Sequence, residues 1–341
     1  MAKKKVTIND VAKHCHLSIA TVSRIVNNLD YPISEKTRKK VMAAVEELQY
    51  TPNVLGRYLK QNQTNEVGVI VPHISNYYYS EIVAGINDSL LHSGYSVLLC
   101  DSYRNPRFEK KQILSLAAKK VKGIIWSPSS SELTWERSLI PENIALVTVD
   151  QPVRLLSHSV STHHEEGGRI AARYLLEKGH TKIAFASAPL TARKYQQQMD
   201  GFLQELKSNG IEPDPAYIRM SDSDRISENT YEFDIGIRLA NSLSRLPSPP
   251  TAVVCISDTM AIGMIRGLKT RGLRVPEDIA VVGFGNLAVA DMVTPALTTV
   301  DQCMRNIGTK AVEILMKEFD TPGLPLENIL FEPQLIKRES A

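Results

Sequence analysis

The side chains best suited to chemistry in this sequence are cations and short hydroxyls near its start. Residues 1–65 carry 11 Lys and Arg against 5 Asp and Glu, whereas the remaining residues carry 29 against 32. Among these cations, Arg24 has a guanidinium that can donate two hydrogen bonds to guanine O6 and N7. The uneven charge predicts that the basic segment meets a polyanion, and the alternative is a solvated basic tail.

Hydroxyl and amide side chains accompany Arg24. Such groups can hold phosphates and fix the register of a protein on a duplex, but they also cap helices and stabilise turns. Ile19 and Ala20, one turn before Arg24, offer only apolar contact, for example to a thymine methyl group. The polar candidates are Thr7, Ser18, Thr21, Ser23, Asn27, Ser34 and Thr37.

Signals for catalysis or metal binding are weak. Residues 283–288 match the GxGxxA pattern of dinucleotide sites, with Asp301 about 18 residues after the first glycine. A dinucleotide-binding crossover needs a full helix next, whereas Thr294-Pro295 would end it within about two turns. The His-Cys-His triplet at 14–16 could suggest a metal, but adjacent side chains point apart. We therefore expect a protein that is not an enzyme and holds no cofactor or metal.

The composition bounds the class of protein. The 341 residues are 43% hydrophobic and 23% charged, which excludes disorder and predicts two or three domains. The four cysteines form no close pair, which suits a reducing compartment. The basic start is followed by no apolar leader, and no run approaches 18 apolar residues. We expect a cytoplasmic protein without a membrane segment.

Three short helices are predicted in the first 50 residues. Each follows a Ser or Thr that can cap it, and the third repeats apolar residues at i, i+3, i+4 and i+7. About four residues, 14–17, separate the first two helices, which is typical of a helix-turn-helix. The caps and helices are Thr7 with 8–14, Ser18 with 19–27, and Ser34 with 35–49.

Two segments carry a family resemblance. Residues 6–28 (VTINDVAKHCHLSIATVSRIVNN) and 34–60 (SEKTRKKVMAAVEELQYTPNVLGRYLK) resemble the DNA-binding head of the LacI/GalR repressor family. In that family TVSR lies on a recognition helix, whose N-terminal residues contact base edges in the major groove. The resemblance adds Tyr50 and Asn53 to the candidate DNA-binding residues.

The resemblance also implies a hinge helix at 51–60. In relatives two such helices meet over DNA, and a leucine from each, here Leu59, wedges into the central minor-groove step beside Lys60. Gly56 stands where relatives usually have Ala, so we expect the free hinge to be unfolded. Residues 61–65 (QNQTN) read as a polar linker.

From residue 67 onward, apolar runs alternate with amphipathic stretches, and a second series of this alternation begins near residue 180. It predicts parallel sheets covered by helices. Residues 71–86, 176–190, 256–284 and 293–302 resemble the two-lobed periplasmic-binding-protein-like core of the same family. The expected fold is a small all-α helix-turn-helix head plus an α/β core of two parallel-sheet lobes. Strands are predicted at 67–72, 96–101, 123–127, 144–150, 182–187, 251–257 and 279–284.

The resemblance divides the chain into a head, a hinge and two lobes. We expect the first lobe to be built from two separate stretches of the chain, and the second lobe likewise. The expected segments are 1–50 for the head, 51–65 for hinge and linker, about 66–162 and 295–326 for the first lobe, and about 163–294 and 327–341 for the second.

Ligands of such a core bind between the lobes, at the carboxyl ends of strands. Gln198 stands where many relatives have Arg, Ser257 where Asn is common, and Gly285-Asn286 where Asp-Asp is usual. We therefore expect a less charged cleft and a ligand other than the family's usual one, or no ligand at all. Tyr rings can stack on a sugar or base ring, and a carboxylate at a strand end can accept hydroxyls. The effector-binding candidates are Tyr78, Tyr79, Ser127, Asp150, Gln198, Ser257 and Asn286.

These observations predict a homodimeric regulator, expected to repress a carbohydrate-related operon. Its partners would be double-stranded operator DNA, a second copy of the chain, and a small-molecule effector that is a sugar or sugar derivative. The alternatives are a phosphorylated carrier protein as co-repressor, no effector, or an NAD-dependent enzyme. A relative with such a carrier has Arg where this chain has Thr294, which weakens the first alternative.

Overall fold

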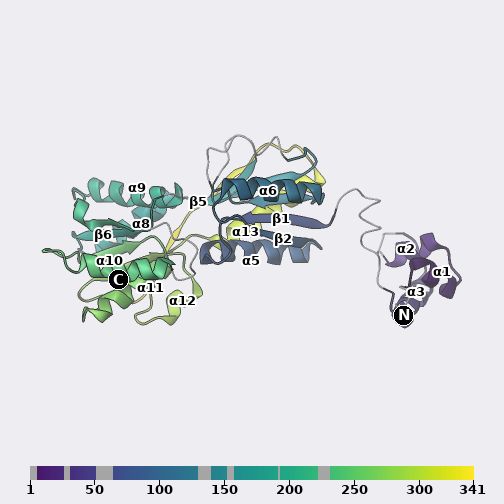
Figure 1. The fold of residues 1–341 in the computed structure, drawn as a ribbon, viewed down its shortest axis with the longest axis horizontal. Coiled ribbons are helices and arrows are strands. Elements are labelled where there is room, and N and C mark those ends of the chain that lie inside the picture. Colours follow the sequence, from purple (N-terminus) through teal and green to yellow (C-terminus); the bar gives the residue numbers. More distant parts are fainter. Residues whose placement is uncertain are drawn as a thin grey trace. The chain divides into compact units, whose positions relative to one another are not determined.

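The structure is a computed structural model that describes residues 6–26, 31–50, 64–129, 140–151, 157–190, 193–221 and 231–341. It divides into two compact units, Met1–Gln63 and Thr64–Ala341 (Figure 1). Each unit has its own buried apolar core. Within the described residues, no helix is both long enough and apolar enough to cross a bilayer.

The first unit, called the head below, contains α1 (Ile8–Cys15), α2 (Ile19–Val26) and α3 (Glu35–Glu47). This confirms the three predicted helices, with α3 ending two residues early. Their caps form as predicted, because the side chains of Thr7, Ser18 and Ser34 each hydrogen-bond within the first turn that follows. The buried core comprises Val11, Ala12, Cys15, Val22, Ile25, Val41, Ala44 and Tyr50.

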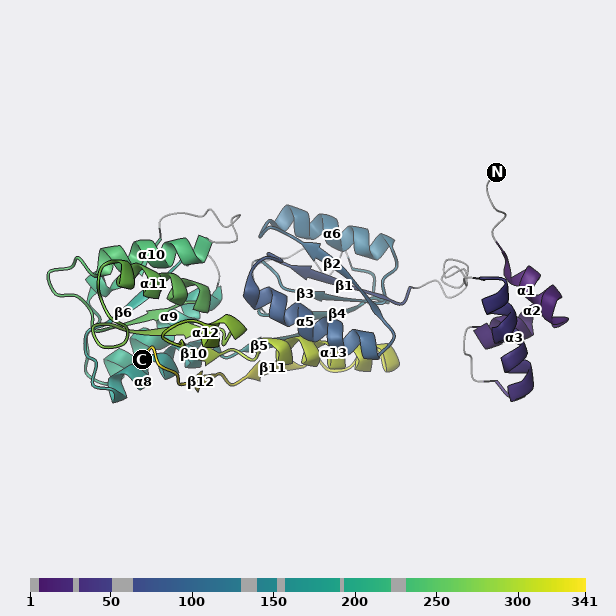
Figure 2. The same ribbon diagram turned by 90° about the horizontal axis from the view of Figure 1, so that it is seen from below.

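The second unit, called the core unit below, holds two six-stranded sheets, one in each lobe. In the first lobe, α6 (Pro106–Ala118) covers one face of the sheet, and α5 (Tyr77–His92) and α13 (Met304–Asp320) cover the other (Figures 1 and 2). The strands of this sheet are parallel and lie in the order β11 (Asn328–Phe331), β5 (His158–Thr162), β4 (Ala145–Val149), β3 (Gly123–Trp126), β1 (Glu66–Val71) and β2 (Ser96–Asp101).

The second lobe repeats this design. One face of its sheet is covered by α8 (His164–Glu177) and α9 (Arg193–Ser208). The other face is covered by α10 (Tyr231–Leu243) and α11 (Asp258–Thr270), as Figures 1 and 2 show. A short 3-10 helix, Pro215–Tyr217, leads into its edge strand. The strands lie in the order β12 (Gln334–Ile336), β10 (Thr298–Asp301), β9 (Ala280–Phe284), β8 (Ala252–Cys255), β6 (Ile183–Ser187) and β7 (Ile218–Met220), with only β12 antiparallel among these described pairings.

The expected lobe boundaries need correction after residue 294. Strand β10 pairs with β9 in the second sheet, although 295–326 was expected in the first lobe. Strand β11 pairs with β5 in the first sheet, although 327–341 was expected in the second. The chain therefore crosses between the lobes three times, after β5, after β10 and after β11. The expectation failed because β10 and β11 are four-residue strands without the long apolar run that marks the inner strands.

Glycines allow the covering helices to approach each other closely. A Cβ atom on Gly201 of α9 would lie 1.9 Å from the carbonyl oxygen of Glu165, and one on Gly168 of α8 would lie 2.0 Å from that of Gln198. The same reciprocal arrangement recurs in the other helix pairs. The three glycine pairs are Gly85 with Gly308, Gly168 with Gly201, and Gly236 with Gly263. Any larger residue at these positions would force the helices apart.

Candidate functional site

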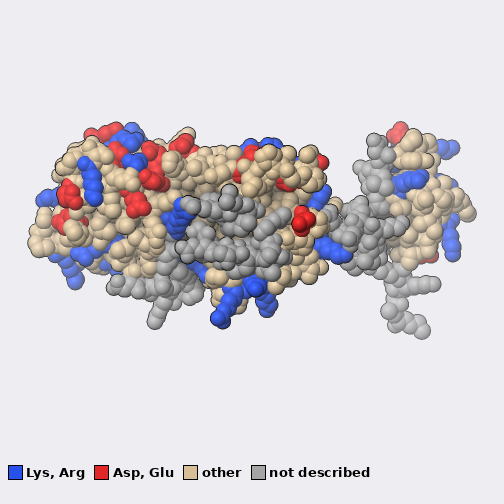
Figure 3. Space-filling view, turned by 90° about the horizontal axis from the view of Figure 1, so that it is seen from above, with Lys and Arg blue, Asp and Glu red and all other residues tan. Residues whose placement is uncertain are grey.

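In the head, α2 presents one buried and one exposed face. Val22 and Ile25 are 0% and 2% exposed, whereas Ile19 is 50% exposed and Ala20 is also exposed. The guanidinium of Arg24 lies over the ring of Tyr31, 4.1 Å from its centroid. The ring of Tyr31 thereby restrains the orientation of Arg24 through a cation–π contact. Lys and Arg side chains stand out on the described surface of the head (Figure 3).

The predicted phosphate-binding hydroxyls of the head already have capping partners. The Thr7 hydroxyl donates to Asp10 at 2.7 Å, and the hydroxyls of Ser18 and Ser34 lie 2.8 Å from those of Thr21 and Thr37. A hydroxyl can both donate and accept, so capping leaves some hydrogen-bonding capacity for phosphate. Ser23 is half-buried on α2.

The other predicted DNA-binding residues are either buried or outside the described part of the chain. The side chain of Tyr50 packs in the core of the head and is 8% exposed, so it is not part of the exposed surface. The predicted hinge helix at 51–60 falls outside the described part of the chain. The candidates outside the described residues are Asn27, Asn53, Leu59 and Lys60.

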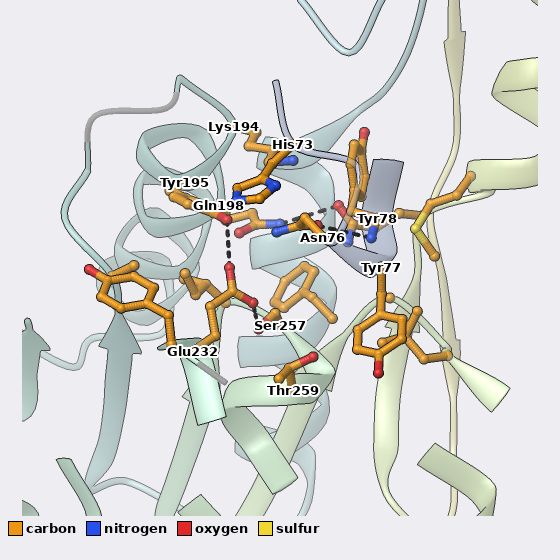
Figure 4. A pocket seen from close by; sticks show the side chains of 18 of the residues that line it. His73, Asn76, Tyr77, Tyr78, Lys194, Tyr195, Gln198, Glu232, Ser257 and Thr259 are labelled. Carbon is orange, nitrogen blue, oxygen red and sulfur yellow. Dashed lines mark hydrogen bonds between the residues drawn. The ribbon is translucent and has the colours of Figure 1, made fainter. Parts of the chain in front are cut away.

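The core unit has a pocket lined by side chains from both lobes. It encloses about 890 Å³, part of it open to solvent (Figure 4). Three of the predicted effector-binding residues, Tyr78, Gln198 and Ser257, line it. The first lobe contributes His73, Asn76, Tyr77, Tyr78 and Arg104, and the second contributes Lys194, Tyr195, Gln198, Glu232, Ser257 and Thr259, among others.

The remaining four candidates do not line the pocket. Tyr79, Ser127 and Asp150 are buried and are not among its lining residues. Asn286 is held in a separate network, in which its amide nitrogen donates to Asp301 at 3.0 Å and its amide oxygen accepts from Arg338 at 2.8 Å. The sequence-based prediction therefore brings together only part of the residues that face this pocket.

The expectation that the cleft is less charged than in relatives stays a prediction, but the pocket does carry charged side chains. Arg104, Lys194 and Glu232 all line the pocket, although none of them was singled out in the sequence. Two signals could have found the cations. Lys194 precedes Gln198 by four residues and so shares its helix face. Arg104 follows the carboxyl end of β2, where the cleft of such a fold lies. No comparable signal marks Glu232.

Glu232 organises the polar half of the pocket. Its carboxylate accepts hydrogen bonds from Tyr195 at 3.1 Å and from Ser257 at 2.7 Å, and Figure 4 shows it between them. Arg104, from the other lobe, also interacts electrostatically with Tyr195. Burial, together with Glu232, raises the pKa of Tyr195, so its hydroxyl stays neutral and donates.

Gln198 supplies an open acceptor. Its amide nitrogen makes a long contact of 3.4 Å to Gln302, and its amide oxygen is buried with no hydrogen-bond partner among the described residues. A buried polar atom left unsatisfied costs roughly 1–3 kcal/mol. A ligand donor that reached this oxygen would therefore recover free energy on binding.

Behind the pocket, Asp150 collects four partners. It accepts hydrogen bonds from Tyr78 at 2.9 Å and Tyr79 at 3.1 Å, contacts His164 at 3.2 Å, and pairs with Lys194 at 3.5 Å. Burial alone would raise the pKa of Asp150, but Lys194, His164 and Tyr78 together bring it below the usual range. Asp150 is thus an anion inside the protein, and its hydrogen-bonding capacity is already in use.

The geometry does not support the two alternative interpretations of motifs, a dinucleotide site at 283–288 and a metal site at 14–16. After residues 283–288, helix α12 (Ala288–Met292) has only five residues, as the position of Pro295 predicted. At the triplet 14–16, Cys15 is buried and His14 pairs with Glu47 at 3.2 Å. Among the described residues, no three His, Cys, Asp or Glu side chains converge on a common point.

Comparison with known proteins supports this geometry. The model of bacterial regulatory proteins of the lacI family matches residues 7–53, and a periplasmic binding protein-like domain matches 172–341. The HTH-type transcriptional repressor PurR of Vibrio vulnificus (strain CMCP6) is 33% identical to this chain over 98% of both chains. The chain belongs to the LacI family. As a member it is a DNA-binding transcriptional repressor and not an enzyme.

Solved structures of transcriptional regulators match nearly the whole chain. The Lac repressor dimer bound to operator and the anti-inducer ONPF is 28% identical, covers 99% of both chains, and has a TM-score of 0.86. The transcriptional regulator CelR in complex with cellobiose is 26% identical, covers 99% of this chain and 100% of its own, and has a TM-score of 0.70. The predicted fold class, a helix-turn-helix head with a two-lobed α/β core, is confirmed.

Proposed function

We propose that this repressor acts in the cytoplasm as a homodimer on a near-palindromic operator of a carbohydrate-related operon. A sugar or sugar derivative bound between the lobes would control it. Support comes from the similar structures of the Lac repressor with operator DNA and of the regulator CelR with cellobiose. The observation that carries the proposal is the pocket itself, which is lined from both lobes and combines Tyr rings with the open acceptor of Gln198.

The pocket can couple to DNA because both lobes form its walls. A ligand that touches both lobes binds one relative arrangement of them better than another, which is the condition for coupling. In the proposed mechanism the lobe arrangement sets the spacing of two hinge segments, 51–65, and through them of two heads. Specific binding then changes with the ligand.

The effector side of the proposal predicts a loss of ligand response at Gln198. Sugars, sugar phosphates and sugar acids are screened by thermal shift, and the best compound is measured by calorimetry. Replacing Gln198 with Met should weaken binding of that compound by about 1–3 kcal/mol, because the ligand donor loses its buried acceptor.

Gln196→Met is the matched control, since this exposed residue lies on the same helix and its amide contacts Leu190. It should leave the affinity unchanged. If no compound of the three classes stabilises the protein, or if Gln198→Met binds as tightly as the native chain, the effector site is misplaced.

The DNA side of the proposal predicts a change of base preference at Arg24. Operator sequences are first selected from a random duplex pool with the native protein. Arg24→Ala should then lose about 1–3 kcal/mol at each half-site and accept several bases at one position, because a bidentate guanine contact is removed. Fluorescence anisotropy with single-base operator variants measures both effects.

Lys39→Ala removes the same charge from another helix of the head, where Lys39 makes an exposed pair with Glu35 at 3.6 Å among the described residues. It should weaken all duplexes about equally, without relaxing the preference at any base. Unaltered base preference in Arg24→Ala would rule out α2 as the reading helix.

A further inference from the structure

Lys194 is an unusual residue for the inside of a protein. Its side chain starts on α9 of the second lobe and ends among residues of the first, and it is 2% exposed. Burying an ammonium is costly unless it is paired, and burial lowers the pKa of Lys194, with Asp150 acting in the opposite direction. Its surroundings must therefore supply a specific compensation.

The first lobe supplies that compensation as an aromatic and anionic cage, here defined as Tyr78, Tyr79 and Asp150. The ammonium nitrogen lies 3.4 Å from the centroid of the Tyr78 ring and 4.5 Å from that of Tyr79. It also lies 3.5 Å from the Asp150 carboxylate and 3.5 Å from the Tyr79 hydroxyl. Aromatic faces with a carboxylate are the chemistry that binds organic cations.

The cage has hydrogen bonds of its own besides its contacts with Lys194. Both tyrosines belong to the start of α5, where Asn76 caps the helix by accepting from Tyr78 N–H at 3.0 Å. Both hydroxyls donate to Asp150, which fixes the two rings in a T-shaped arrangement with centroids 5.2 Å apart. An ammonium from any source would meet the same rings and the same carboxylate.

We propose that the first lobe carries a binding site for a primary alkylammonium group, and that Lys194 of the second lobe is its tethered occupant. Lys194 thus holds the two lobes together without a small molecule. Asp150, expected to accept a ligand hydroxyl, is instead committed to this internal cation. The site stands on the contacts around Lys194 and does not depend on which effector the pocket takes.

A second cationic side chain also contacts the opposite lobe, this time from the first lobe to the second. Arg104 of the first lobe interacts electrostatically with Tyr195 of the second, whose hydroxyl donates to the carboxylate of Glu232. Tyr195 neighbours Lys194 in sequence, so both of these contacts between the lobes lie at the start of α9. Lys194 is the better test residue, because its surroundings are fully buried and its length matches a simple soluble amine.

The test uses chemical rescue in the full-length protein. Lys194→Ala removes the chain beyond Cβ, and n-propylammonium supplies the missing three carbons and the nitrogen. We expect propylammonium to raise the melting temperature of Lys194→Ala by about 2–4 °C at saturating concentration and to leave the native protein unaffected. 1-Propanol, which has the same length without the charge, should not rescue.

Hydrogen exchange of the full chain distinguishes a local contact between the lobes at Lys194 from a general effect of Lys194 on the stability of the protein. In Lys194→Met, which fills a similar volume without charge, amides in the first turns of α5 and α9 should exchange roughly tenfold faster or more. Amides in the central strands of both sheets should keep their protection. This variant also keeps the proposal testable if Lys194→Ala fails to fold.

Lys178→Ala is the control, because Lys178 is exposed and its ammonium lies 5.6 Å from the Tyr174 ring within one lobe. It should show neither rescue by propylammonium nor faster exchange at α5. The proposal is overturned if propylammonium fails to stabilise Lys194→Ala, if propanol stabilises it equally, or if exchange in Lys194→Met is unchanged at both first turns.

Discussion

Removing residues 1–63 is expected to abolish sequence-specific DNA binding and to leave the rest of the chain folded. The reason lies in how the two units are built. Among the described residues, the apolar core of the head draws on residues within 6–50, and the cores of the second unit draw on residues from 67 onward. The deletion therefore opens no cavity in the core unit, while it removes every candidate DNA-binding residue.

Two measurements check this expectation. Anisotropy titrations with a selected operator should show a fall in affinity of at least 10³-fold. This value is the lower end of the usual ratio between specific and non-specific affinity. Thermal unfolding of residues 64–341 should stay cooperative, and the pocket should respond to the same ligands as the native chain. If the fragment kept operator preference, the head would not be the reading element; if it failed to fold, the division into two units would be wrong.

Replacing Gly201 with Ala is expected to cause a large loss of stability, about 3 kcal/mol or more. Overpacking a well-packed interior costs about 1–3 kcal/mol even where side chains can move aside. Here the new methyl carbon would lie 1.9 Å from the carbonyl oxygen of Glu165 and 2.8 Å from its carbonyl carbon, both of which are backbone atoms of α8. The helices can relieve this contact only by moving apart.

Urea unfolding at 25 °C measures the effect as a lower midpoint for Gly201→Ala. Asp200→Ala is the matched control, because it changes the adjacent, exposed residue of the same helix and should stay within about 0.5 kcal/mol of the native value. Gly168→Ala, on the facing helix, should destabilise similarly. Near-native stability of Gly201→Ala would show that α8 and α9 are not in contact along this line.

The sequence predicts the inner elements of this fold well. The three head helices and seven strands form where caps and apolar runs indicated. The five other strands escaped notice because they lie at or near sheet edges, are short, or are polar. Strand β5 reads His-Ser-Val-Ser-Thr and is nevertheless fully buried, since Ser159 and Thr162 find partners in Asn328 and the backbone of Gln302. Such long-range pairing leaves no local periodicity to detect.

The candidate site was harder to predict than the fold. The family resemblance pointed to Gln198 and Ser257, where relatives commonly have Arg and Asn. The charges that line this pocket, Arg104, Lys194 and Glu232, lie at other positions. Their effect depends on partners far away in sequence, as with Lys194 and Asp150. The DNA-binding and effector-binding sets stay predictions.

The three crossings between the lobes have a consequence for how such proteins diversify. The head is a single continuous segment, so one recombination event can place it on another effector module and change the target genes. Neither lobe is continuous, because the first is completed by residues after Asp301 and the second by residues after Phe331. Exchanging one lobe would require several simultaneous breakpoints. New ligand preferences should therefore accumulate by point substitution around the pocket, while DNA targets can be acquired by shuffling whole segments.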